Sequence, residues 1–207
     1  MTFPELVENI EHQCRTLVWW SPDQIARGED VLNDPKKGER AWAVPRQTAQ
    51  WLHDTISRHR PMTILELGTS IGYSTAWMAH AASAYGGHVH TIEIRNYKYD
   101  IAKQNLTDGG LVRFVTMYNA PIIDILNNLE LHLSGQKIDL VFMDADRGHY
   151  HEYFPLIEPF LSPGALIVAD NAISHAARMQ PFMNLLDEHG WKRDLIGIDN
   201  GILVAHK

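Results

Sequence analysis

The sequence predicts a three-layer α/β/α sandwich: a Rossmann-like, mostly parallel sheet with an antiparallel C-terminal hairpin. Short apolar runs alternate with helix-length segments from residue 63 onward, which indicates βαβ units. Residues 140–143 and 166–169 are apolar at every position, as in strands that are covered on both faces. The turn sequence Asp-Asn-Gly at 199–201 separates two apolar runs and predicts the hairpin.

The predicted elements follow in order along the chain. Apolar side chains at helical spacing predict a first helix over residues 4–20, and the polar segment 28–41 predicts a loop. The predicted strands are 63–67, 88–94, 112–117, 138–143, 165–169, 191–196 and 202–205. The predicted helices between them are 74–85, 98–108, 122–132, 150–161 and 176–189. We expect two parts, an N-terminal helical arm with its loop (1–40) and a core domain (41–207).

The composition excludes several classes of protein. The 207 residues suit one domain, and 45% hydrophobic with 21% charged residues is the balance of a globular protein. The single cysteine, Cys14, excludes an internal disulfide and a cysteine-based zinc or iron–sulfur site. The net charge of −7 argues against nucleic acid and membrane surfaces as partners. The sequence shows no secretory signal and no apolar run long enough to cross a bilayer, so we expect a cytoplasmic protein.

The segment Glu66-Leu-Gly-Thr-Ser-Ile-Gly-Tyr-Ser74 follows the first of these strands and points to a ligand site. In an open parallel sheet, ligands bind beyond the carboxyl ends of the strands. Gly68 and Gly72 permit a tight turn and a close approach of a ligand to the backbone. The spacing differs from the G-x-G-x-x-G motif of dinucleotide sites, and the Glu66 carboxylate would repel a pyrophosphate. It suits a ligand with an amino or sulfonium group; a plain strand–helix turn is the alternative.

Acidic side chains also end other strands. Glu93 stands where an acid typically binds ribose hydroxyls, and with the glycine turn it indicates a nucleoside. Asp144 follows one strand, and Asp170 and Asn171 follow the next. Adjacent parallel strands would bring these three together, and their oxygens are ligands that suit Mg²⁺, Ca²⁺ or Mn²⁺. A local helix cap or Asx-turn is the alternative for the last two residues.

These motifs carry a resemblance to a known family. Residues 64–75, 91–93, 142–146 and 167–171, with Tyr150 and Tyr153, resemble the class I S-adenosylmethionine-dependent methyltransferases. Within that class the chain resembles the small metal-dependent O-methyltransferases of the catechol and caffeoyl-coenzyme-A type. The resemblance covers about residues 41–207 and identifies them as the methyltransferase domain. It implies methyl transfer from S-adenosylmethionine to a hydroxyl of a small acceptor, an aromatic vicinal diol in the first place. It also implies a divalent cation, with Mg²⁺ preferred over Ca²⁺ or Mn²⁺.

The resemblance also implies roles for single residues. It makes Asp144, Asp170 and Asn171 the metal ligands. Around the cofactor it places Val44, Glu66, Gly68, Thr69, Ser70, Gly72, Ser74, Glu93, Ala120 and Asp144.

Arg147 stands where the family has a lysine that acts as general base. Arginine stays protonated in proteins and cannot take a proton from a hydroxyl. We therefore expect Arg147 and Asp144 to be the catalytic pair, with Arg147 stabilising an oxyanion or holding a substrate carboxylate. Asp146, His149 and His151 are the candidate proton acceptors.

Two other functions stay open. A nicotinamide-dependent oxidoreductase would share the sheet, although the spacing around Gly68 argues against it. A non-catalytic nucleoside-binding domain would fit a chain that has arginine in place of the base. Trp19, Trp20 and Trp42 flank the N-terminal loop, and they either cover an aromatic acceptor or pack the arm on the core. The arm is also a candidate interface of a homodimer.

Overall fold

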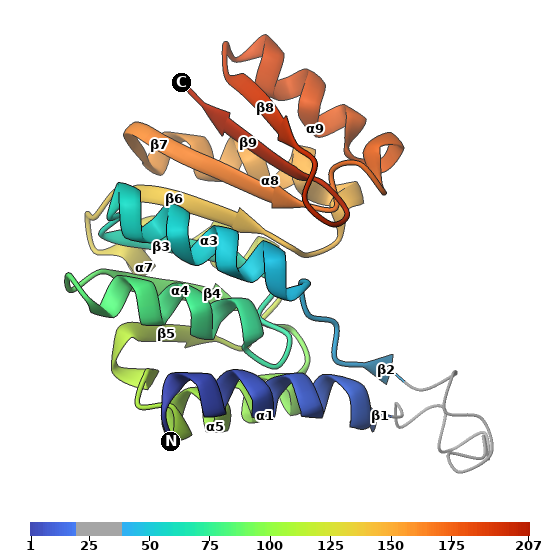
Figure 1. The fold of residues 1–207 in the computed structure, drawn as a ribbon. Coiled ribbons are helices and arrows are strands. Elements are labelled where there is room, and N and C mark those ends of the chain that lie inside the picture. The colour runs from blue at the N-terminus through green and yellow to red at the C-terminus, as the bar shows by residue number, and fades with distance from the viewer. Residues whose placement is uncertain (20–38) are drawn as a thin grey trace.

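A computed structural model of the chain describes residues 1–19 and 39–207 (Figure 1). Its strands are β1 (Val18–Trp19), β2 (Glu39–Arg40), β3 (Thr63–Leu67), β4 (His88–Ile92), β5 (Val115–Tyr118), β6 (Ile138–Met143), β7 (Leu161–Asp170), β8 (Lys192–Ile196) and β9 (Ile202–His206). Its α-helices are α1 (Phe3–Thr16), α3 (Arg46–His59), α4 (Tyr73–Ser83), α5 (Asn96–Asp108), α6 (Ile122–Leu126), α7 (Leu129–Leu133), α8 (Tyr150–Ile157) and α9 (Ala176–Glu188). Short 3₁₀ turns are η1 (Val112–Phe114), η2 (Arg147–His149) and η3 (Glu158–Phe160).

The main sheet has the strand order β5-β4-β3-β6-β7-β9-β8. Strands β3 to β7 pair in parallel, whereas β9 is antiparallel to both β7 and β8. The predicted parallel sheet with an antiparallel C-terminal hairpin is therefore confirmed. The chain runs from β3 outward to β4 and β5 and then returns to β6 on the other side of β3. This reversal of strand order between β3 and β6 is the place where such sheets bind ligands.

The sheet separates two hydrophobic cores. Alternate residues of a strand point to opposite faces, so Ile64 joins the core under α1, α3 and α4, while its neighbour Leu65 joins the core under α8 and α9. Helix α5 lies on the first face, and α6 and α7 lie on the second (Figure 1). Every residue of β3 is buried, as predicted for a strand that is covered on both sides.

Helix α4 is buried nearly all round because other helices cover it. Residues 73–79 are buried without a gap, and α1 and α3 both pack on this helix. The first helix docks on the domain, since Leu6, Val7 and Ile10 of α1 are buried in the same core. In the part of the chain that the structure describes, no helix is long and apolar enough to cross a membrane.

The predicted element boundaries hold for 63–67 and 138–143 and differ elsewhere. The first helix ends at Thr16 and not at residue 20, because Leu17 takes an extended backbone and β1 follows. The strand predicted over 112–117 starts with η1 and pairs only from Val115 onward. The helix predicted over 122–132 is two helices, α6 and α7, that are separated at residues 127–128.

Predictions for the N-terminal loop are only partly covered by the structure. Residues 28–38 of the predicted loop, and Trp20, lie outside the described residues. Residues Glu39–Arg40 form β2, which pairs with β1, and are not loop. The side chain of Trp42 is 74% exposed, so the prediction that it packs the arm on the core is wrong for this residue. Helix α3 was not among the predicted helices, because the predicted alternation of strands and helices begins at residue 63, after this helix.

Candidate functional site

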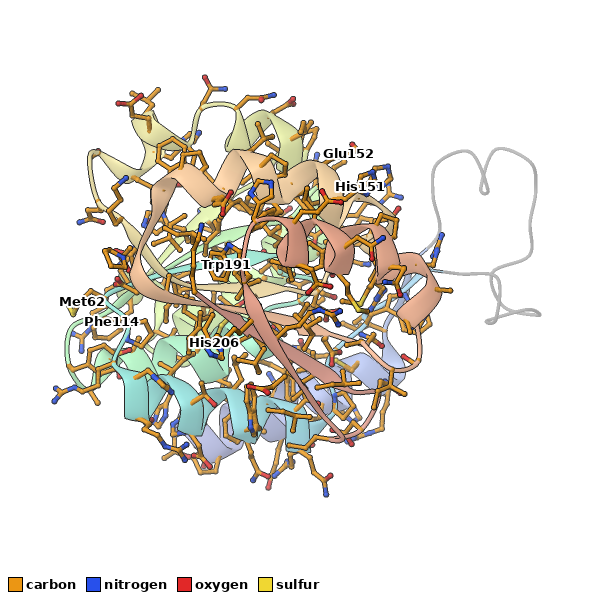
Figure 2. All side chains as sticks on the ribbon, turned by 90° about the horizontal axis from the view of Figure 1, so that it is seen from above. Met62, Phe114, His151, Glu152, Trp191 and His206 are labelled. Atoms are coloured by element: carbon orange, nitrogen blue, oxygen red, sulfur yellow. The ribbon has the colours of Figure 1, made fainter. Side chains whose placement is uncertain are left out.

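The polar residues predicted from the strand ends lie along one edge of the sheet. Glu66, Glu93, Asp144 and Asp170 belong to the carboxyl ends of β3, β4, β6 and β7, which are parallel neighbours. Figure 2 gives the direction: Met62, just before β3, lies at one end of the molecule, and His151, just after η2, lies at the other. The fold therefore brings to one edge the acidic residues that the sequence singled out.

The carboxylate of Glu66 lies completely inside the protein. Oε1 accepts a hydrogen bond from Ser74 Oγ (2.5 Å), and Oε2 accepts from Thr75 Oγ1 (2.5 Å) and Thr91 Oγ1 (2.6 Å). Burial raises the pKa of Glu66 to about 7, although these three hydroxyl bonds lower it. Glu66 therefore ties the start of α4 to β3 and β4 from below the turn.

Residues 68–72, called here the glycine loop, connect β3 to α4. Gly68 and Gly72 have φ values of +100° and +86°, which glycine adopts without strain. Ser70 also has a positive φ, +49°, a conformation that is uncommon for residues with a side chain. Its Oγ is buried and has no hydrogen-bond partner among the described residues. The loop is strained and lies where the strand order reverses, and it holds a buried hydroxyl that lacks a partner among the described residues. These features are typical of a loop that binds a polar ligand.

Glu93 is braced beside the glycine loop. Its carboxylate accepts hydrogen bonds from the backbone N–H of Ser70 (2.8 Å) and of Arg95 (2.8 Å). The side-chain amide of Asn119 donates to the Glu93 carbonyl (2.8 Å), so the end of β5 is fixed to the end of β4. Ala120, the next residue, is half-buried. A carboxylate oxygen accepts more than one hydrogen bond, so these two contacts are compatible with ribose hydroxyls as further donors to Glu93.

Asp144, Asp170 and Asn171, called here the oxygen cluster, meet between β6 and β7. The Asn171 amide nitrogen lies 2.7 Å from Asp170 Oδ2 and 3.5 Å from Asp144 Oδ1. Asp170 Oδ1 is buried and has no hydrogen-bond partner in the described residues. Burial, followed by the neighbouring Asp170, raises the pKa of Asp144 to about 6, while Arg147 lowers it. Burial is also the main cause that raises the pKa of Asp170.

The buried carboxylate of Asp170 and the largely buried one of Asp144 have raised pKa values, and Asp170 Oδ1 has no partner in the described residues; these features fit a divalent cation. Asn171 can add an oxygen if its amide is turned, since the two ends of the amide are interchangeable in shape. Over residues 1–19 and 39–207, no group of three or more His, Cys, Asp or Glu side chains is arranged to hold a metal. The oxygen cluster is not such a group, because it consists of two carboxylates and an amide.

Arg147 lies against the oxygen cluster. Its Nη2 lies 3.1 Å from Asp144 Oδ1, and its Nε is buried without a partner in the described part of the chain. The side chain is 23% exposed, so it is accessible at the edge of the site. The predicted pair of Arg147 and Asp144 is therefore in contact.

The candidate proton acceptors lie further out. His149 pairs with Asp146 (3.2 Å) and is half-exposed. His151 faces Glu152 (3.9 Å), and Figure 2 shows both on the outside of α8. Asp146 accepts a hydrogen bond from the Gly148 N–H, which is the first cause that lowers its pKa.

Val44, the residue predicted to close over the cofactor, is buried in the core that α1, α3 and α4 share.

Several residues that shape the site had no role assigned to them from the sequence. Thr91 bonds Glu66 across the sheet, and the Tyr150 hydroxyl accepts from the Ala145 N–H (2.9 Å) just after Asp144. Asp199, in the C-terminal hairpin, accepts from the Thr48 N–H (3.1 Å) and hydroxyl (2.9 Å) at the start of α3.

Comparison with known proteins agrees with this geometry. A family described as "Methyltransferase domain" matches residues 65–172, more than half of the chain. A catechol O-methyltransferase of Niastella koreensis is 32% identical over 169 residues, 82% of this chain and 75% of that protein. A catechol O-methyltransferase of Mycobacterium tuberculosis is 33% identical over 131 residues, 63% of this chain and 57% of that protein.

The fold is also similar to that of solved structures. An O-methyltransferase from Bacillus cereus, solved in complex with S-adenosylhomocysteine (SAH), superposes with a TM-score of 0.72 over 99% of both chains at 21% identity. The matches agree with what the structure shows. The same chain that has the glycine loop, the acid after β4 and this sheet order also matches the methyltransferase family and catechol O-methyltransferases. The chain belongs to the class I S-adenosylmethionine-dependent O-methyltransferases of the catechol O-methyltransferase type.

Proposed function

We propose that the protein transfers a methyl group from S-adenosylmethionine to a hydroxyl of a small acceptor, an aromatic vicinal diol, with the help of a divalent cation. The observation that carries this proposal is the oxygen cluster beside the glycine loop. The carboxylates of Asp144, which is largely buried, and Asp170 both lie within reach of the Asn171 amide, and Asp170 Oδ1 has no hydrogen-bond partner among the described residues. Such a cluster is costly in an empty state and is relieved by a cation.

The residues of the glycine loop would hold the cofactor. Glu93 would accept hydrogen bonds from the ribose hydroxyls, and Ser70 Oγ, which has no partner among the described residues, would donate to a polar group of the same ligand. Gly68, Thr69, Gly72 and Ser74 shape the loop, and Ala120 would line the base. Glu66 would support the loop and not contact the cofactor directly, because its carboxylate already accepts hydrogen bonds from three hydroxyls. When bound, S-adenosylmethionine supplies the methyl group of its sulfonium for in-line transfer to an oxygen.

Asp144, Asp170 and Asn171 would hold Mg²⁺ first, with Ca²⁺ or Mn²⁺ as alternatives. When bound there, the ion supplies Lewis-acid chemistry that lowers the pKa of an acceptor hydroxyl. The cluster would also fix the acceptor next to the cofactor. Correct orientation of two reactants alone can lower the activation barrier by roughly 7–11 kcal/mol.

Arg147 would act as a fixed positive charge and not as a base. Its buried Nε, which has no partner in the part of the chain that the structure describes, can donate a hydrogen bond to the oxyanion of the acceptor or to an acceptor carboxylate. The hydroxyl proton would pass to water or to one of the candidate acceptors Asp146, His149 and His151, because Arg147 cannot take it.

The test is methyl transfer to catechol and to phenol, measured by mass spectrometry with Mg²⁺ or with a chelator. We expect methylation of catechol with Mg²⁺ only. In Asp170→Ala, Mg²⁺ should no longer change the rate of methyl transfer. The affinity for SAH should stay within about twofold of the parent, since sites that are not in contact usually act independently. Tight SAH binding without transfer to any hydroxyl would indicate a nucleoside-binding domain instead. Thermal stabilisation by NAD and not by SAH would indicate an oxidoreductase.

A further inference from the structure

Helix α1 is joined to the cofactor side of the domain by the side chain of Glu11. Its Oε1 accepts hydrogen bonds from Arg46 Nε (2.8 Å) and from the Tyr73 hydroxyl (2.6 Å). Its Oε2 accepts from the second guanidinium nitrogen of Arg46, NH2 (2.8 Å). Arg46 is the first residue of α3, and Tyr73 is the first residue of α4, directly after Gly72 of the glycine loop. One carboxylate therefore holds the starts of two helices.

This contact is stronger than an ordinary surface ion pair. The guanidinium of Arg46 meets both carboxylate oxygens, which is the bidentate geometry that gives such pairs their strength. Glu11 is only 24% exposed, and Tyr73 is 3% exposed. The hydrogen bond from Arg46 is the first cause that lowers the pKa of Glu11, so the residue is ionised at neutral pH. Isolated, exposed pairs contribute little, whereas a part-buried network of three groups couples its members.

A second polar connection runs from α1 to the same loop. The side-chain amides of Gln13 and Asn105 exchange two hydrogen bonds, of 3.0 Å and 2.8 Å. Asn105 also donates to the carbonyl of Ile71 (3.0 Å), which lies within the glycine loop. Asn105 is 1% exposed, so loss of Gln13 would take the donor away from its buried side-chain oxygen, while its amide nitrogen would keep the Ile71 carbonyl. Each of these two connections thus reaches the glycine loop or the residue that follows it.

We propose that α1 is a positioning element of the cofactor site, and that Glu11 is its central positioning residue. Glu11 holds the end of the glycine loop through Tyr73, and through Arg46 it holds the start of α3, two residues after Val44. It thereby fixes the distance between the two segments that are proposed to enclose the cofactor. The inference rests on the proposed cofactor role of these segments and goes beyond it, because α1 lies outside the matched family domain of residues 65–172.

Coupling of this kind acts in both directions. If the docked α1 favours the loop conformation that binds the cofactor, the bound cofactor must stabilise the docking of α1 by the same free energy. A role of Glu11 in stability alone would lower the melting temperature and leave both effects absent. The affinity for SAH and the hydrogen exchange of α1 therefore separate positioning from stability.

The experiment compares the parent protein with Glu11→Ala, Tyr73→Phe and the double variant. Glu8→Ala is the matched control, since Glu8 is an exposed glutamate one turn earlier on α1. SAH affinity is measured by calorimetry, and amide exchange over residues 3–16 is measured with and without SAH. We expect Glu11→Ala to weaken SAH binding about tenfold and Tyr73→Phe about threefold, within the range of coupled sites. The double variant should bind SAH no more weakly than Glu11→Ala, because both substitutions remove the same hydrogen bond between Tyr73 and Glu11.

SAH should slow exchange in α1 of the parent and of Glu8→Ala but not in Glu11→Ala. Equal SAH affinity of Glu11→Ala and the parent, or equal protection of α1 by SAH in both, would overturn the inference. Tyr73→Phe removes one hydroxyl only, and it keeps the test open if Glu11→Ala does not fold. A parent protein that binds no SAH would instead contradict the proposed function.

Discussion

The backbone carbonyl of Asp144 lies directly over Gly68. A Cβ atom on Gly68 would stand 2.4 Å from this oxygen, closer than real atoms approach. The Asp144 N–H in turn donates to the carbonyl of Leu67 (3.0 Å). The loop proposed to bind the cofactor and the strand end proposed to bind the cation are therefore packed backbone against backbone at the switch point of the sheet. A change in one displaces the other.

Gly68→Ala tests this contact. Its φ of +100° disfavours any side chain, and the new Cβ would push against backbone that cannot move freely. We expect a loss of roughly 2–4 kcal/mol in the free energy of unfolding, measured in urea, together with weaker SAH binding. Gly86→Ala is the control, because Gly86 also has a positive φ (+83°) but has nothing within 4 Å of the added Cβ. Equal losses in the two variants would contradict the close contact.

The buried Glu66 predicts a pH dependence of stability. Its pKa is raised to about 7 by burial, so between about pH 4.5 and 7 the folded chain holds a proton that the unfolded chain has lost. The stability from this proton is fully present below pH 4.5 and is lost as the pH rises through 7. At about 1.4 kcal/mol per pKa unit the loss is roughly 3 kcal/mol.

Glu66→Gln removes the titrating group and keeps the shape of the side chain. Urea unfolding of the cofactor-free protein at pH 5 and pH 8 should show a smaller decrease of stability for this variant than for the parent. Glu188→Gln, at an exposed position of α9, should behave like the parent. If all three proteins lost the same stability between these pH values, Glu66 would not be the titrating group.

Glu93→Ala removes the proposed acceptor of the ribose hydroxyls. We expect SAH to bind at least about tenfold more weakly, as for the loss of a charged hydrogen-bond acceptor. Calorimetry with an SAH analogue that lacks both ribose hydroxyls makes the test specific. The parent should discriminate against the analogue, whereas the variant should bind SAH and the analogue equally. Undiminished discrimination by the variant would place the ribose elsewhere.

Arg147→Met tests the fixed positive charge beside the oxygen cluster. The variant should lose kcat/KM for a dihydroxybenzoate more than for catechol, by about tenfold or more, because a charged hydrogen bond to a carboxylate contributes roughly 1.5–3 kcal/mol. Arg178→Met, on the exposed side of α9, is the control for net charge. The same loss for both acceptors would mean that Arg147 does not recognise acceptor charge.

The sequence predicted the main sheet and its functional edge because both depend on local signals. Apolar runs mark buried strands, and the acids after them were brought to one edge by parallel pairing. The partners of Glu66 could not be predicted in the same way. Thr91 reaches Glu66 from β4, and hydroxyls of that kind are common in strands without such a role.

Contacts between distant segments were also beyond the sequence. Glu11 and Tyr73 are separated by 62 positions, and nothing in the helical spacing of α1 marks Glu11 among its acids. The split of the segment 122–132 into two helices depends on residues 127–128, where the chain turns between α6 and α7. Such features follow from packing in three dimensions, which overrides local propensity.

A crystal structure with SAH and Mn²⁺ tests the central claim most directly, because the anomalous signal of manganese locates the ion independently of the ligand. We predict SAH on the glycine loop with its ribose at Glu93, and one manganese peak within bonding distance of Asp144, Asp170 and Asn171. SAH bound away from the carboxyl ends of β3 and β4, or manganese bound away from the ends of β6 and β7, would contradict the account.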